Sequence, residues 1–154
     1  NLSILDLVKY RKKEGNKLVK EIKLYIRSIQ KTIKQLRFLE KARKKQKQEK
    51  ILQKLTSIQG GVNYDPARLE QEMIYYFEKY DITEERVRLE GHCQFFFEIL
   101  KDEYSGRKLV FLAQEILREI NTIGSKANNL YIQKHVVEMK ELIDKTKEQL
   151  QNIL

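Results

Sequence analysis

The sequence predicts an all-α protein, with one very long N-terminal helix followed by a helical bundle that ends in a second long seam helix, meaning a helix with one narrow apolar stripe. Apolar residues recur at spacings of three and four through most of the chain, and we find no stretch with the period of two that is typical of a strand. A single proline, Pro66, and six glycines leave few chain breaks, which argues against a sandwich or barrel of short strands. The 154 residues, 41% of them hydrophobic, suffice for one domain with a buried core.

The first predicted element is a long helix over residues 1–58. A helix of this length spans roughly 80 Å, which is longer than a compact domain of this size. Between Glu40 and Lys50 lysine and arginine replace the apolar residues, so we expect this part of the helix to project into solvent or to fray. Before it, the apolar residues form a narrow stripe, here called the seam, which is expected to pack on partner helices: Leu18, Ile22, Ile26, Ile29, Ile33 and Leu36.

Residues 59–154 begin with a loop and a short helix. Gly60 and Gly61 mark the loop by composition. Asp65 followed by Pro66 is typical of a helix start, with the aspartate as N-cap and proline at the first helical position. We expect this helix to end near Tyr80.

Three more helices complete the predicted bundle. Asp81 or Thr83 is suited to cap the third helix, and a polar break over residues 102–106 precedes the fourth. We expect Gly124 to end the fourth helix as a left-handed cap and the last helix to begin near Ser125. The seam of this last helix consists of Ile132, Val136, Met139, Ile143, Thr146, Leu150 and Ile153.

Charge divides the chain at residue 58. Residues 1–58 contain 18 lysines and arginines against 5 acidic residues, a net charge of +13, whereas residues 59–154 contain 13 against 17, a net charge of −4. One interpretation is a basic, polyanion-binding arm over residues 1–58 joined to a helical C-terminal domain over residues 59–154. The other is a lysine-rich helix whose charges serve only to keep it solvated.

Several classes of protein are excluded by composition. Cys93 is the only cysteine, so the chain forms no internal disulfide and no multi-cysteine zinc site, which suits a reducing compartment. Cys93 directly follows His92, and adjacent residues on a helix point in different directions, so the two do not form a nucleophile and base. We see no signal peptide, membrane span, glycine-rich phosphate loop or serine elbow. We therefore expect a cytoplasmic protein with no membrane partner.

The fourth predicted helix carries the candidate catalytic residues. Glu115 and Glu119 lie one turn apart at the edge of the apolar stripe, flanked by Lys108 and Arg118. Like charges at this spacing repel, so something must offset them. Ordinary salt bridges to Arg118 or Lys108 are one explanation. A divalent cation held by both carboxylates is the other.

The stretch from Asn121 to Lys126 follows directly. If a new helix begins after Gly124, its free backbone N–H groups, the Ser125 hydroxyl and the Lys126 ammonium are suited to bind a phosphate. The alternative is a simple turn between helices with a serine cap. Seven aromatic residues elsewhere have the helical spacing of core residues, and for most we expect core packing rather than base stacking: Tyr75, Tyr76, Phe77, Tyr80, Phe95, Phe96 and Phe97.

These motifs together resemble the C-terminal signature of the YicC-like family, and the resemblance covers nearly the whole chain. Val110 and Asn129 stand where that family usually has aspartates. The matching residues include Gly106-Arg107-Lys108-Leu109, Gln114-Glu115, Arg118-Glu119, Asn121-Thr122-Ile123-Gly124-Ser125-Lys126-Ala127, Asp81-Ile82-Thr83-Glu84-Glu85, Arg88-Leu89 and His92.

The resemblance implies a function as well as a fold. Members of that family are bacterial, about twice as long, and are described as metal-dependent endoribonucleases that favour Mn²⁺ and form hexamers. The chain, which begins with Asn1 rather than methionine, would then be the C-terminal part without its N-terminal domain. An alternative is a non-catalytic RNA-binding or oligomerisation module.

The endoribonuclease hypothesis assigns roles to particular residues. Glu115 and Glu119 would hold the metal ion and act in catalysis together with Arg118. The expected RNA-binding residues are Arg107, Lys108, Asn121, Ser125 and Lys126 on the fourth helix, with Lys44 and Lys45 on the first.

Overall fold

The computed structural model describes residues 3–58, 65–102 and 105–153, so the loop predicted around Gly60 and Gly61 lies outside it. The described residues contain no strand, which confirms the all-α prediction together with the long first and last helices. The helices are α1 (Ile4–Ile58), α2 (Pro66–Tyr80), α3 (Thr83–Ile99), α4 (Gly106–Lys126) and α5 (Leu130–Ile153).

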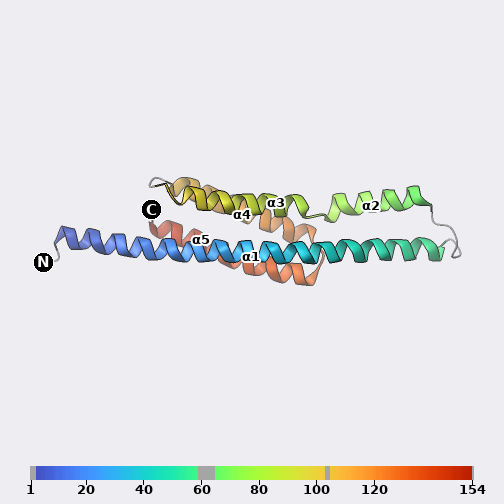
Figure 1. Ribbon diagram of the computed structural model, residues 1–154, viewed down its shortest axis with the longest axis horizontal. Helices are drawn as coiled ribbons and strands as arrows, with labels where there is room; N and C mark the ends of the chain where they lie inside the picture. The colour runs from blue at the N-terminus through green and yellow to red at the C-terminus, as the bar shows by residue number, and fades with distance from the viewer. Residues whose placement is uncertain (1–2, 59–64, 103–104, 154) are drawn as a thin grey trace.

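Helix α1 runs along the full length of the molecule (Figure 1). Helices α2 and α3 return along it, α4 reverses direction again, and α5 lies alongside α1. Helices α1, α3, α4 and α5 share one apolar core, while α2 packs against the C-terminal part of α1. None of the described helices has an apolar stretch long enough to cross a membrane.

The predicted seams form this core. The α1 residues from Ile22 to Leu36 and the α5 residues from Ile132 to Leu150 are buried at the predicted positions, whereas Ile153 is 40% exposed. Spacings of three and four keep these side chains on one face of each helix, which explains why both faces turn inward.

The expectation of core packing for most of the seven aromatics is wrong, because only Tyr76 and Phe96 are buried. The others are half-buried or exposed: Phe77, Tyr80 and Phe97 are half-buried, and Tyr75 and Phe95 are exposed.

The basic part of α1 neither frays nor stands alone in solvent. The helix continues to Ile58 because α2 lies beside it and because the residues that connect α2 to α3, here called the α2–α3 joint, contact it. Arg43 donates a hydrogen bond to the backbone carbonyl of Tyr80, and the Glu40 carboxylate is buried against Arg86. The expectation that this stretch would project or fray is therefore wrong.

The predicted start of α2 is confirmed, whereas the predicted cap of α3 is wrong by one residue. The Asp65 side chain accepts a hydrogen bond from the Ala67 N–H, with Pro66 at the first helical position. At the start of α3 the N-cap position is occupied by Ile82 rather than by the predicted Asp81 or Thr83, and Asp81 acts from one residue earlier, where its Oδ1 accepts a hydrogen bond of 3.0 Å from the Thr83 N–H. Both aspartates satisfy N–H groups that have no partner within the helix.

The predicted boundary between the last two helices is wrong. Helix α4 passes through Gly124 and ends at Lys126, and α5 begins only at Leu130. The Asn129 side chain caps α5 by accepting hydrogen bonds from two backbone N–H groups. Gly124 instead permits close packing, because a Cβ atom there would lie 3.0 Å from Cγ1 of Val136 on α5.

Burial of Glu40 makes its ion pair important for stability. The Glu40 side chain is 5% exposed, and its Oε2 lies 3.2 Å from Nε of Arg86. We predict that Glu40→Gln lowers the free energy of unfolding by about 3 kcal/mol, because Arg86 is left as a buried charge without its partner. Urea denaturation measures the change. The exposed Glu49→Gln on the same helix is the control, and equal stabilities of the two variants would contradict the prediction.

Candidate active site

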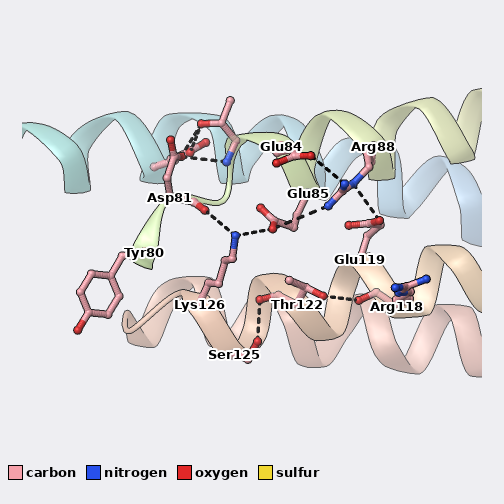
Figure 2. Close-up of polar contacts among 12 residues, drawn as sticks. Tyr80, Asp81, Glu84, Glu85, Arg88, Arg118, Glu119, Thr122, Ser125 and Lys126 are labelled. Atoms are coloured by element: carbon pink, nitrogen blue, oxygen red, sulfur yellow. Dashed lines mark hydrogen bonds and ion pairs between the residues drawn. The ribbon is translucent and has the colours of Figure 1, made fainter. Parts of the chain in front are cut away.

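Two buried carboxylates lie on either side of Arg88, where the start of α3 packs on the C-terminal half of α4. The Glu85 and Glu119 side chains are 4% and 8% exposed. They meet because α3 and α4 run in opposite directions along one another. Arg88 lies between them, with Nε 3.1 Å from Oε1 of Glu119 and Nη2 3.9 Å from Oε1 of Glu85 (Figure 2).

A second cation completes this cluster. Nζ of Lys126 lies 2.6 Å from Oε1 of Glu85 and 3.5 Å from the backbone carbonyl oxygen of Asp81 (Figure 2). The other carboxylate oxygen of Glu85, Oε2, is buried and has no hydrogen-bond partner among the described residues. A buried acceptor without a partner is costly, which marks this oxygen as a place where a ligand can bind. We call Glu85, Arg88, Glu119 and Lys126 the α3–α4 cluster.

A neighbouring group of polar residues joins the α3–α4 cluster to α1. The Thr83 hydroxyl lies 2.6 Å from Oδ1 of Asp81 and 2.7 Å from Oε1 of Glu40, and it has only one proton to share between them. Nζ of Lys44 lies 3.2 Å from Oδ1 of Asp81. Burial by itself raises the pKa of the Asp81 carboxyl, but the hydrogen bonds from Thr83 and the Lys44 ammonium outweigh burial and hold the pKa well below its usual range.

The two glutamates predicted from spacing have different surroundings. Glu119 pairs with Arg88, a partner from another helix that the spacing did not indicate, whereas the nearest cation to Glu115 is Arg118, at 3.9 Å. The Glu115 side chain is also more open, at 27% exposed. Within the described part of the chain, no three histidine, cysteine or acidic side chains lie together in a way that suits a metal ion. Metal binding by Glu115 and Glu119 therefore stays a prediction.

The other predicted residues of α4 lie on more than one face. Lys126 points toward α3, whereas Arg118, Asn121 and Ser125 line an open surface groove. Ser125 donates its hydroxyl hydrogen bond to the carbonyl of Thr122 within α4. The predicted phosphate site at a helix start is wrong, because residues 124–126 form the last turn of α4 and a helix engages the N–H groups of its last turn.

The remaining predicted RNA-binding residues are spread along the molecule. Arg107 and Lys108 are exposed in the first turn of α4, and Lys108 is about 27 Å from Lys126 along the helix axis. Lys45 is exposed on α1, whereas Lys44 pairs with Asp81 in the polar group at the α2–α3 joint, here called the polar joint. The structure therefore does not gather these side chains into one site.

Cys93 is a core residue, as expected. It is fully buried, and burial together with the nearby Glu90 carboxylate raises the pKa of its thiol to about 12. A thiol with so high a pKa is protonated near neutral pH and is a poor nucleophile. This excludes cysteine-based hydrolysis in α3.

Comparison with known proteins identifies the group to which this chain is related. Residues 33–154 match the family described as "Endoribonuclease YicC-like, C-terminal". The chain belongs to the YicC-like endoribonuclease family. It is 38% identical over 151 residues to the probable endoribonuclease YicC of Haemophilus influenzae and 35% identical over 153 residues to that of Clostridioides difficile. These alignments cover 97% and 98% of the YicC-like chain but 52% of each relative, so the chain spans about half the length of the relatives.

The structure of the YicC-like chain places two residues in the candidate site that the sequence did not single out. Glu85 and Arg88 sit in the upstream motif that supports the family resemblance, so a signal was present. Periodicity did not reveal them, because Glu84 and Glu85 are equally plausible as acidic residues in the first turn of a helix. In the structure, the Glu84 side chain is 74% exposed and that of Glu85 is buried.

The lowered pKa of Asp81 gives a testable dependence of stability on pH. The charged carboxylate stabilises the fold above the ordinary aspartate pKa of about 4, and this contribution is lost as the pH falls below that value. We predict that Asp81→Asn lowers the free energy of unfolding near neutral pH and makes its fall in acid shallower. Chemical denaturation at a series of pH values measures both effects. Asp144→Asn, at an exposed position of α5, should retain the wild-type pH profile, and a similar retention by Asp81→Asn would refute the prediction.

Proposed function

We propose that the full-length protein is a metal-dependent endoribonuclease that hydrolyses phosphodiester bonds of RNA, and that this chain is its C-terminal portion. The observation that carries the proposal is the pair of buried carboxylates, Glu85 and Glu119, set between two cations in a chain of the YicC-like endoribonuclease family. The relatives are named probable endoribonucleases, which supports RNA as the substrate.

The α3–α4 cluster fits a hard divalent cation. Such cations are bound by one or two carboxylates and take their other ligands from water and substrate phosphates. Glu119 and Glu85 supply two carboxylates, and Oε2 of Glu85 is a buried oxygen without a partner. We propose Glu85 rather than Glu115 as the second carboxylate, with Mn²⁺ as the ion implied by the family. When bound, the ion supplies Lewis-acid chemistry that makes water more acidic and offsets phosphate charge.

The cations of the cluster have two roles in this proposal. Without a ligand, Arg88 and Lys126 offset the charges of Glu119 and Glu85. With an RNA phosphate nearby, both are placed to neutralise the charge that develops on it. Their side chains are 47% and 32% exposed, so the substrate has access to them. Arg118, the predicted catalytic arginine, lies on the outer face of α4 and is proposed only as an RNA contact.

Cleavage by full-length variants distinguishes the two carboxylate pairs. We predict that Glu119→Gln and Glu85→Gln each lower Mn²⁺-dependent cleavage at least about 100-fold, because glutamine keeps the shape but removes the charge needed in the transition state. Glu115→Gln should retain most activity, and the exposed Glu141→Gln serves as a neutral control. Cleavage rates on a labelled RNA, with circular dichroism to confirm folding, provide the measurement. Loss of activity in Glu115→Gln with retention in Glu85→Gln would assign the site to the pair one turn apart on α4.

The second candidate function is a non-catalytic RNA-binding or assembly module. One observation favours it: the described side chains offer no set of three metal ligands, and the carboxylates already have cationic partners. Wild-type cleavage by Glu85→Gln, Glu115→Gln and Glu119→Gln alike would support this function over the first.

We also propose that the chain assembles with copies of itself, for which the family resemblance implies a hexamer. The first turns of α1 expose a run of apolar side chains: Ile4, Leu5, Leu7, Val8 and Tyr10. Continuous exposed apolar surface of this kind is typical of interfaces. We predict that light scattering at micromolar concentration gives a mass above that of one chain and that Leu5→Glu with Val8→Glu lowers it. A single-chain mass for the wild type would rule out self-assembly.

A further inference from the structure

A second polar groove lies beside the candidate active site and has no role in the proposed chemistry. It has a volume of about 360 Å³, within the range of small-molecule sites. Helix α1, helix α2 and the residues after α4 line it, and the described lining residues comprise three cations, three side-chain amides and two tyrosines without a carboxylate: Arg43, Gln46, Lys47, Lys50, Tyr76, Tyr80, Asn128 and Asn129. We call it the α1–α2 groove.

The cations of this groove differ from their neighbours in lacking acidic partners. Lys44, Arg86 and Lys126 each pair with a buried or half-buried carboxylate. Among the described residues, no acidic side chain forms an ion pair with Arg43, Lys47 or Lys50. These three residues are spaced by four and three, so they lie on one face of α1.

Arg43 supplies a second observation that points to a ligand. One of its terminal nitrogens donates to the Tyr80 carbonyl, which holds the guanidinium in place. Its Nε is buried and has no hydrogen-bond partner in the part of the chain that the structure describes. Because an unsatisfied buried N–H is costly, a positioned donor one turn before Lys47, on the same face of α1 as Lys50, points to an anionic ligand such as a phosphate.

The tyrosines and amides distinguish a nucleotide from a simple anion. The Tyr76 and Tyr80 rings lie 5.3 Å apart between centroids, and Nζ of Lys47 lies 5.4 Å from the Tyr76 centroid. Tyr80 is partly exposed, and its ring extends away from the ion pairs of the α3–α4 cluster (Figure 2). An aromatic face stacks on a base, and side-chain amides match the donors and acceptors of base edges.

We propose that the α1–α2 groove binds one unpaired nucleotide of single-stranded RNA, with its phosphate against Arg43, Lys47 and Lys50 and its base against Tyr80. Paired bases in a duplex are stacked on each other and do not present a face to such a groove, so the site selects single strands. The proposal deepens the proposed function and rests on it for the choice of RNA as the ligand.

The groove is connected to the α3–α4 cluster through the chain itself. Tyr80 directly precedes Asp81, whose backbone carbonyl oxygen lies 3.5 Å from Nζ of Lys126. The backbone that carries Tyr80 is therefore joined directly to the lysine that binds Glu85, while the Tyr80 ring extends away from the cluster into the groove. The groove is placed to position the strand next to the cluster without taking part in bond cleavage.

Binding without cleavage tests the groove separately from catalysis. The probe is fluorescein-labelled oligouridine of about 12 nucleotides, titrated with this chain in the presence of EDTA and followed by fluorescence anisotropy. We expect Tyr80→Leu to weaken binding about tenfold through loss of stacking. The control is Tyr75→Leu, which changes an exposed tyrosine of α2 outside the groove and should bind within about twofold of the wild type.

The lysines are tested through salt dependence. We expect Lys47→Gln with Lys50→Gln to lower the slope of log affinity against log salt by about 1.4, because each neutralised phosphate of a single strand contributes about 0.7. Lys31→Gln, at an exposed position of α1 outside the groove, should lower it by less than half as much. Both lysine variants change surface side chains and should fold, which thermal unfolding by circular dichroism confirms.

The outcomes separate the groove from the proposed function. If both groove variants keep the wild-type RNA affinity and salt slope, the proposal that the groove binds a nucleotide is overturned, while the endoribonuclease proposal is unaffected. Equal affinity for a blunt-ended duplex RNA of the same length, which has no unpaired nucleotide, would overturn the selection of single strands. Loss of binding in the groove variants, with the controls unchanged, supports the groove even if full-length protein fails to cleave.

Discussion

Burial of the α1 seam against α3 and α5 is the constraint on which the other features of the structure depend. Its residues between Ile22 and Leu36 are almost completely inaccessible to solvent. Each such side chain contributes about 1.5 to 3 kcal/mol relative to exposure. A solitary helix gains most of its stability from this kind of packing, so the bundle is what keeps a helix as long as α1 ordered. The positions of α3 and α4, and hence of the candidate site, follow from the same core.

The seam of α1 is followed by a buried carboxylate, that of Glu40, and the need to neutralise it explains why polar residues gather at the α2–α3 joint. Glu40 lies one turn after Leu36 and occupies the next inward position of α1. A buried carboxylate must be neutralised, so Arg86 and the Thr83 hydroxyl gather around it. Glu85 and Glu119 repeat this requirement nearby, with Lys126 and Arg88 as the counter-charges. The α2–α3 joint is therefore held by paired charges next to an apolar core.

The basic stretch of α1 divides into two groups with different surroundings. Lys44 is engaged in the joint, where it holds Asp81. Arg43, Lys47 and Lys50 line a groove whose other described lining residues are tyrosines and amides. One helix thus contributes both to the stability of the joint and to a surface suited to a phosphate. The joint connects that surface to the α3–α4 cluster through Asp81 and Lys126.

The sequence by itself determined the features that depend on local periodicity. Spacings of three and four predicted the all-α fold, the two long helices and their seams, and the Asp65-Pro66 pair predicted the start of α2. It did not determine the end of α4, because Gly124 is equally compatible with a left-handed cap and with close packing, and only Val136 on α5 decides between them. Nor did the sequence reveal that Glu119 pairs with Arg88 or that Glu85 also contacts Arg88, since Glu119 belongs to a different helix from the other two. Spacing along one helix reports which side chains share a face, whereas the partner of a buried charge is set by the helix that packs against that face.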